Sequence, residues 1–162
     1  MLKNTVRRIA LLASLPAVLV SLVVTGTPAN AAMVAPTATE RTLISHTNTA
    51  RARAGCAAVH VNYQLTYAAR AHSRDMVVRN YFGHRSPSGT NFVMRAKAAG
   101  YNSPMSENIG WGYRTSASLF NAWMQSPGHR ANIVNCSARA VGIGIAYKAN
   151  GTPYYTQIFG RV

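Results

Sequence analysis

Residues 106–132 read SENIGWGYRTSASLFNAWMQSPGHRAN, and this stretch contains an acid and a histidine in a chain with only three acidic residues. Glu107 stands directly before a short extended segment, and His129 follows Pro127-Gly128, a pattern that predicts the start of a helical turn. Another histidine, His84, lies 23 residues before Glu107. No local spacing joins the three side chains. They can form a site only if the fold brings them together.

The N-terminal segment predicts a secretory signal peptide over residues 1–31. Lys3, Arg7 and Arg8 precede an apolar run at 9–24, and Ala29-Asn30-Ala31 fits the small-residue cleavage pattern. The alternative is an uncleaved anchor, but this run is shorter than the roughly 20 apolar residues that span a membrane. We therefore expect a secreted, extracellular protein with no transmembrane anchor after cleavage.

The chain that follows the signal peptide has the length of one domain and is strongly basic. It carries 14 Lys and Arg against three acids, a formal charge of +11. Such a charge favours anionic partners, including components of the cell envelope. The cations occur singly, and no basic run is interleaved with aromatic residues, so we expect no nucleic-acid binding. No heptad repeat indicates an oligomer, and a monomer is the default.

Cys56 and Cys136 are the two cysteines, and both lie in the part expected to be exported. An even count in an oxidising compartment predicts one disulfide. Two free thiols or a two-cysteine metal site are the alternatives, and the lack of C-x-x-C spacing disfavours them.

Helix signals punctuate the first two thirds of the chain. We expect a flexible lead-in at 32–40 and the domain at 41–162, with Thr37-x-x-Glu40 as a capping box at the start of the first helix. Further helices are predicted at 63–79 and 91–99, and a fourth between Thr115 or Ser116 and Pro127. In the second helix, His72 and Asp75 are expected to have structural roles.

The last third of the chain predicts β-structure. Segments 140–147 and 153–160 are rich in branched and aromatic residues, and Asn150-Gly151 between them is a strong hairpin signal. With the extended segment at 109–113, this gives a small antiparallel sheet flanked by helices. The predicted fold class is α+β, with helices layered on the sheet.

Several short motifs carry a family resemblance. They are Asn48-x-x-Arg51, Ser73-x-Asp75-Met76, Gly83-His84-x-Ser86-Pro87, Glu107-Asn108-Ile109, Trp123-x-x-Ser126-Pro127-Gly128-His129-Arg130 and Gly142-Ile143-Gly144. In order and spacing they resemble the CAP superfamily (cysteine-rich secretory proteins, antigen 5 and pathogenesis-related 1; SCP domain), and its secreted bacterial branch most. The resemblance covers about residues 41–160 and implies an α-β-α sandwich.

The resemblance also implies a cavity lined by two histidines and two acids that can bind a divalent metal. By motif, His84, Glu107 and His129 match three of these residues. Ser126 occupies the position of the second acid, and Asn108 and Ser126 are expected to line the cavity. Two imidazoles and one carboxylate can hold Zn²⁺ with an open position. The missing acid predicts weak binding of Zn²⁺ or another divalent cation. A buried hydrogen-bonded network of the same residues is the alternative.

Three functions remain open from the sequence. Family members are best known as extracellular binding modules, some for sterols or fatty acids, and this chain offers apolar residues for such a ligand: Phe92, Val93, Met94, Met105, Trp111, Tyr113, Leu119, Phe120 and Met124. We therefore expect a non-enzymatic binding module for a lipid-like, sterol-like or cell-envelope ligand. The alternatives are a metal-dependent hydrolase using His84, Glu107 and His129, and a cationic wall-associated protein. No residue is assigned as catalytic.

Overall fold

Helix α1 begins at its predicted capping box. The structure is a computed structural model that describes residues 35–161, so the predicted signal peptide lies outside the described residues. α1 spans Ala38–Arg53, the Thr37 hydroxyl accepts from Glu40 N, and Glu40 accepts from Thr37 N. Glu40 is buried and bonds Arg70. The first turn of α1 therefore packs against α2, three residues before the predicted boundary at residue 41.

The other helices follow their sequence signals closely. α2 spans Tyr63–Val78, α3 Phe92–Ala98 and α4 Ser116–Gln125, with Asn62, Asn91 and Thr115 as N-caps. Pro127 ends α4 and is the first residue of α5, Pro127–Ile133. Within residues 35–161 no helix is both long enough and apolar enough to cross a membrane.

The sheet has four strands in the order β1-β3-β4-β2. β3 (Ala140–Tyr147) and β4 (Pro153–Gly160) form the predicted hairpin, and β2 (Pro104–Trp111) pairs antiparallel with β4. β2 begins earlier than predicted, because Pro104 opens the strand instead of marking a turn, a position that proline tolerates. β1 spans His60–Val61, a segment for which no strand was predicted. It pairs parallel with β3, so the sheet is mixed rather than purely antiparallel.

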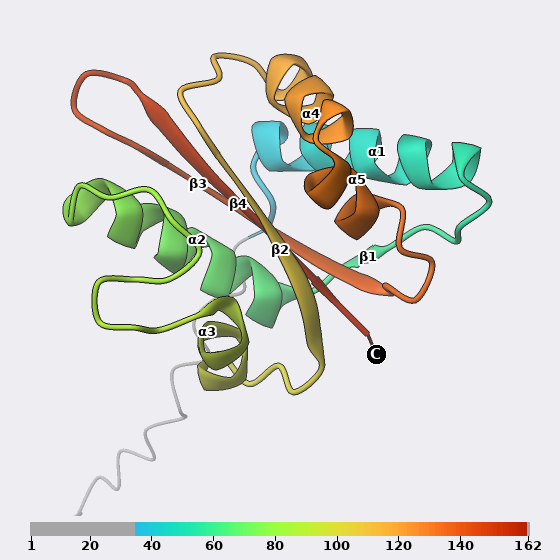
Figure 1. Cartoon of the computed structure of the whole chain (residues 1–162), viewed down its shortest axis with the longest axis horizontal. Helices are drawn as coiled ribbons and strands as arrows, with labels where there is room; N and C mark the ends of the chain where they lie inside the picture. Colours follow the sequence, from blue (N-terminus) through green and yellow to red (C-terminus); the bar gives the residue numbers. More distant parts are fainter. Residues whose placement is uncertain (1–34, 162) are drawn as a thin grey trace, which may run out of the picture. The chain divides into compact units, whose positions relative to one another are not determined.

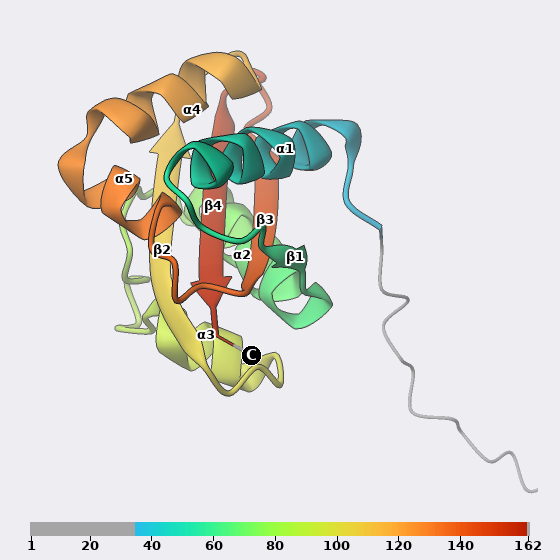
Figure 2. The same cartoon turned by 90° about the vertical axis from the view of Figure 1, so that its right-hand side faces the viewer.

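Helices cover both faces of this sheet, in the α-β-α sandwich that was predicted (Figure 1, Figure 2). α1, α4 and α5 lie on one face, and their core includes Leu43, Leu119, Trp123 and Ile133. α2 and α3 lie on the other face, where Leu65, Ala69 and Ala96 pack against Ile158. α2 rests directly on β3, because a Cβ at Gly142 or Gly144 would overlap the backbone of α2.

A disulfide and several hydrogen bonds link the end of α1 to the segment that precedes β3. Cys56 and Cys136 form the predicted disulfide, across a sequence separation of 80 residues. Beside it, the fully buried guanidinium of Arg51 donates to the carbonyl oxygens of Ala57, Ile133, Asn135 and Ala138 at 2.8–3.0 Å. Within residues 35–161, the hydrogen bonds of this guanidinium go to carbonyl oxygens and not to a carboxylate. The motif Asn48-x-x-Arg51 is therefore part of the framework of the fold.

Candidate functional site

The fold brings His84 and Glu107 together at the edge of the sheet. β2 is an edge strand, and the loop that bears His84 connects α2 to α3 on one side of it. The Nδ1–H of His84 donates to Glu107 Oε1 at 2.9 Å. The Glu107 side chain is 1% exposed, whereas the His84 side chain is 52% exposed. One end of this pair is therefore in the protein interior and the other in solvent.

Arg95 on α3 also contacts Glu107, although no sequence motif predicted it in the site. Its Nη2 donates to Glu107 Oε2 at 2.6 Å and to the His84 carbonyl oxygen at 3.1 Å, and its Nη1 donates to Thr90 O at 2.9 Å. The guanidinium thus neutralises the buried carboxylate and bonds two carbonyl oxygens of the His84 loop, one in its middle and one near α3. We call His84, Arg95 and Glu107 the Glu107 network. A charged, nearly buried acid needs a cationic partner. This requirement is the one feature from which an arginine beside Glu107 could have been predicted.

Asn108 points to the opposite face of the sheet from Glu107, as the alternation along a strand requires. It is fully buried, so it does not line an open cavity as expected. Its amide donates to the carbonyl oxygen of His129 at 3.2 Å and to Gln157 Oε1 at 3.0 Å, and it accepts from Asn132 at 2.8 Å. Gln157 in turn donates to Thr47 Oγ1 at 2.9 Å. This chain of neutral side chains fixes α5 and α1 to β2 and β4.

His129 lies in the first turn of α5, and its backbone, not its imidazole, is what bonds Asn108. The imidazole is partly buried, and burial lowers its pKa, with a smaller contribution from the positive charge of His84. The two histidines are therefore close enough to interact electrostatically. Ser126 is the N-cap of α5, but its side chain makes no capping hydrogen bond there.

His72 and Asp75 on α2 are structural, as predicted. His72 is fully buried, and its Nε2 donates to the carbonyl oxygen of Gly83 at 3.0 Å, directly before His84. Burial lowers the pKa of His72, because desolvation disfavours the charged imidazolium. Asp75 accepts from Arg79 Nε at 2.9 Å and from the Tyr81 hydroxyl at 2.5 Å. Both residues thus support the start of the His84 loop.

Comparison with known proteins agrees with this architecture. The model of the cysteine-rich secretory protein family, CAP, matches residues 44–159. This chain belongs to the CAP family. It is 35% identical over 124 residues to the uncharacterised protein YkwD of Bacillus subtilis, covering 75% of this chain and 47% of YkwD. It is 29% identical to the uncharacterised membrane protein YlbC of the same organism, covering 76% of this chain and 34% of YlbC. The chain thus spans less than half of either protein.

Solved structures show the same CAP fold. An extracellular protein containing an SCP domain from Bacillus anthracis superposes with a TM-score of 0.71 at 28% identity, over 76% of this chain and 40% of that one. An outer surface protein of Borrelia burgdorferi gives a TM-score of 0.69 at 18% identity, over 75% of this chain and 90% of that one. The second likeness concerns the fold alone.

The Glu107 network of this CAP protein does not fit a metal ion. Both carboxylate oxygens of Glu107 are engaged, one by His84 and the other by the cationic Arg95. The Arg95 guanidinium lies 2.6 Å from Oε2, so the negative charge of Glu107 already has a cationic partner. Across the described part of the chain, no group of three or more His, Cys, Asp or Glu is positioned to hold a metal. This geometry favours the hydrogen-bonded network over the alternative, a metal centre.

An apolar groove lies on the α1, α4 and α5 side of the sheet. It has a volume of about 360 Å³. We call it the acyl groove, after the ligand proposed for it below, and define it by these lining residues: Ala50, Arg53, Ala54, Phe120, Asn121, Met124, Arg130 and Val134. Of the apolar residues that the sequence offered for a ligand, Phe120 and Met124 are in this groove. Leu119 is instead fully buried in the core, and Trp111 is 52% exposed elsewhere on the surface.

Proposed function

We propose that this CAP protein is a secreted, non-enzymatic binding module that takes a long-chain fatty acid in the acyl groove. The observation that carries the proposal is the pairing of an apolar floor with two arginines. Phe120, Met124 and Val134 supply apolar surface, and Arg53 and Arg130 belong to the same lining. An acyl chain with a carboxylate head matches both parts.

The charge of the groove supports an anionic head group. All three acids of the chain pair with arginines elsewhere: Glu40 with Arg70, Asp75 with Arg79 and Glu107 with Arg95. Within residues 35–161, neither Arg53 nor Arg130 has an acidic partner. Both lie on exposed helix positions, and guanidinium groups bind carboxylates through paired hydrogen bonds.

The floor of the groove supports the chain of the ligand. Phe120 is only 9% exposed and belongs to the main core, so its ring is held in place from below. Met124 packs against the same core with an adaptable thioether side chain. Each buried methylene of a ligand contributes about 0.8 kcal/mol. An acyl chain that covers this floor with several methylenes would therefore bind several kcal/mol more tightly than a head group alone.

The test is a titration of the purified protein with palmitate, followed by displacement of a fluorescent fatty acid. The double variant Arg53→Gln/Arg130→Gln removes both cations without changing the apolar floor. We expect a loss of affinity of roughly tenfold or more, because charged hydrogen bonds each contribute about 1.5–3 kcal/mol. The matched control is Arg74→Gln/Lys97→Gln, which changes exposed cations on α2 and α3.

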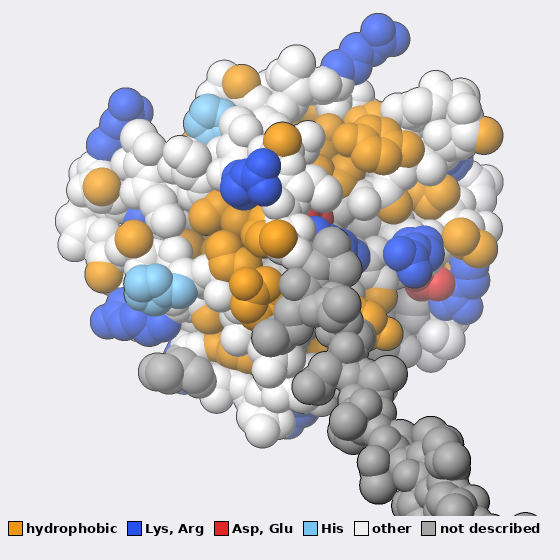
Figure 3. Space-filling view, turned by 180° about the vertical axis from the view of Figure 1, so that it is seen from behind, with side chains coloured by type: hydrophobic (Ala, Val, Ile, Leu, Met, Phe, Trp, Pro, Cys, Tyr) orange, Lys and Arg blue, Asp and Glu red, His pale blue; other side chains and the backbone are white. Residues whose placement is uncertain are grey.

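Two results would reject the proposal. The first is no palmitate binding by the unmodified protein. The second is an equal loss of affinity in the variant and in its control, which would mean that overall charge, not the acyl groove, attracts the fatty acid. Overall charge could also attract a fatty acid, since Lys and Arg side chains occur at several separate places on the face shown in Figure 3.

A further inference from the structure

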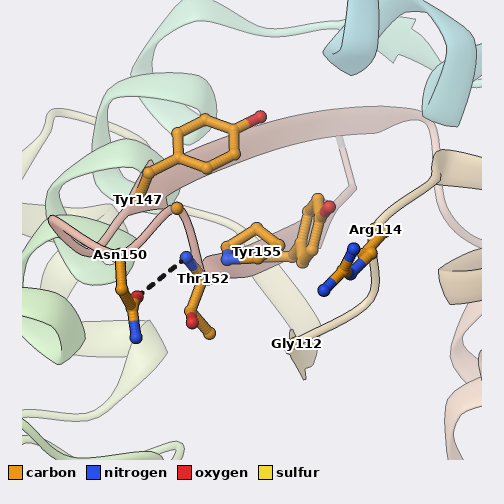
Figure 4. Close-up of a pocket in the computed structure, with 8 residues that line it drawn as sticks. Gly112, Arg114, Tyr147, Asn150, Thr152 and Tyr155 are labelled. Atoms are coloured by element: carbon orange, nitrogen blue, oxygen red, sulfur yellow. Dashed lines mark hydrogen bonds between the residues drawn. The ribbon is translucent and has the colours of Figure 1, made fainter.

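A second hollow, separate from the acyl groove, lies at the end of the sheet where the β3–β4 hairpin meets the segment from β2 to α4. Its volume is about 470 Å³, and we call it the hairpin hollow. The lining residues used below are Gly112, Arg114, Tyr147, Asn150, Thr152 and Tyr155. Figure 4 shows Arg114 extending from the β2–α4 segment toward the hairpin.

The walls of the hairpin hollow are fixed by hydrogen bonds. The buried hydroxyl of Tyr155 donates to the carbonyl oxygen of Tyr113 at 2.7 Å, and Gly112 N donates to Pro153 O at 2.9 Å. Burial raises the pKa of Tyr155 to about 12. The backbone of the hollow is therefore formed before a ligand binds, and the ordering cost falls on the exposed side chains of Arg114, Tyr147 and Asn150.

Arg114 leaves its charge available to a ligand. It is exposed, and in the described part of the chain it has no hydrogen bond or ion pair, because the three acids are occupied by Arg70, Arg79 and Arg95. Its planar guanidinium can bind a carboxylate through two parallel hydrogen bonds. The positive charge of Arg114 therefore favours an anionic ligand, and the paired N–H donors of its guanidinium suit a carboxylate.

Asn150 and Tyr147 add two further kinds of contact. Asn150 Oδ1 accepts from Thr152 N at 3.1 Å, which leaves its amide N–H groups without a partner among residues 35–161 (Figure 4). Tyr147 is 57% exposed and lies on the same side of the sheet as Tyr155, since it follows Ile145, the partner of Tyr155, by two residues. Its ring offers an apolar flat face with a polar tip.

We propose that the hairpin hollow binds a carboxylated sugar, such as a uronic acid unit of an anionic polysaccharide. A pyranose ring presents a face of C–H groups that packs on an aromatic ring, hydroxyls that accept from an amide, and, in a uronic acid, a carboxylate that fits a guanidinium. Tyr147, Asn150 and Arg114 supply these three contacts. The proposal does not depend on the acyl groove.

The experiment is calorimetric titration of the protein with trigalacturonate and with its methyl ester, which has the same sugar rings without the charges. We expect trigalacturonate to bind, and the affinity for the ester to be lower by roughly tenfold or more. Arg114→Gln should lose roughly tenfold in affinity for trigalacturonate, and Tyr147→Ser should lose about fivefold. The controls are Arg74→Gln and Tyr67→Ser, which change an exposed arginine and an exposed tyrosine on α2.

Several outcomes would overturn this assignment: no binding of trigalacturonate, equal affinity for the methyl ester, or equal losses in the α2 controls. Equal binding of a glycerol phosphate oligomer would also overturn it, because that result would assign the hollow to phosphate. Arg53→Gln/Arg130→Gln should keep its affinity for trigalacturonate. Failure of palmitate binding and failure of sugar binding are thus separate results.

Discussion

At Glu107, Arg95 is 10% exposed and directs its donors inward, to a carboxylate and to two carbonyl oxygens of the His84 loop. In the acyl groove, Arg53 and Arg130 are exposed and lack an acidic partner within the described residues. The site that matches the family motif is thus occupied by internal bonds, whereas the groove keeps its cations for a ligand. The comparison separates arginines that hold the fold from arginines that can bind.

The largest expected effect separates two arginines in the last turn of α1. Arg51→Met removes a buried cation that satisfies four carbonyl oxygens, and we expect a loss of about 4 kcal/mol in unfolding free energy. Arg53→Met, two residues away and exposed, should change stability by no more than about 0.5 kcal/mol. Urea denaturation measures both. Similar losses of unfolding free energy in the two variants would contradict the distinction between buried arginines that stabilise the fold and exposed arginines that do not.

Glu107→Gln tests the Glu107 network itself. The substitution leaves the nearly buried Arg95 without its counter-charge, and we expect a loss of about 3 kcal/mol. The double variant Arg95→Met/Glu107→Gln should lose less than the sum of the single variants, because neither charge is then left alone. Thermal and urea unfolding of the four proteins gives the coupling free energy. Additive losses would show that the two side chains do not act as a pair.

The fold was largely predictable from local signals, and the exceptions have physical reasons. Helix caps and the Asn-Gly turn are local features, so α1 to α4 and the β3–β4 hairpin could be placed from the sequence. β1 is only two residues long and has no periodicity to detect. Pro104 resembles a turn residue, but it opens an edge strand, where its missing N–H costs nothing.

The candidate site was only partly predictable. The resemblance singled out His84 and Glu107, which form a hydrogen bond in the structure. Arg95 was not predicted, because the residue spacing along α3 gives no information about a partner on β2. Asn108 was expected beside Glu107 in a cavity, although successive residues of a strand face opposite sides. Placing it correctly required knowing that β2 already starts at Pro104.

A smaller effect concerns pH. Burial lowers the pKa of His72 below its ordinary value of 6.5; the charge of Glu107 opposes this shift, and that of Arg95 adds to it. The folded protein then binds fewer protons than the unfolded chain, so stability is full above about pH 6.5 and falls as the pH drops toward the folded pKa. His129 shifts in the same direction, through burial and then the charge of His84.

His72→Gln should therefore reduce the loss of unfolding free energy between about pH 7.5 and pH 5, as measured by urea denaturation at each pH. The matched control is His60→Gln, which changes an exposed histidine on β1. A pH dependence that is unchanged in His72→Gln but altered in His60→Gln would contradict this account of α2.

The smallest expected effect is that of zinc. Because Arg95 occupies the second oxygen of Glu107, we expect equimolar Zn²⁺ to leave the melting temperature unchanged. A clear rise in melting temperature that disappears in His84→Ala/His129→Ala would show that the Glu107 network rearranges to bind metal, and the contrast with the acyl groove would then weaken.

The most direct test of the central claim is an NMR titration of the ¹⁵N-labelled protein with palmitate. If the acyl groove is the binding site, the amide signals of Ala50, Ala54, Met124 and Val134 shift, while those of Glu107 and Asn108 stay in place. Shifts centred on His84 and Glu107, with none in the groove, would contradict the account and return the binding function to the site that matches the family motif.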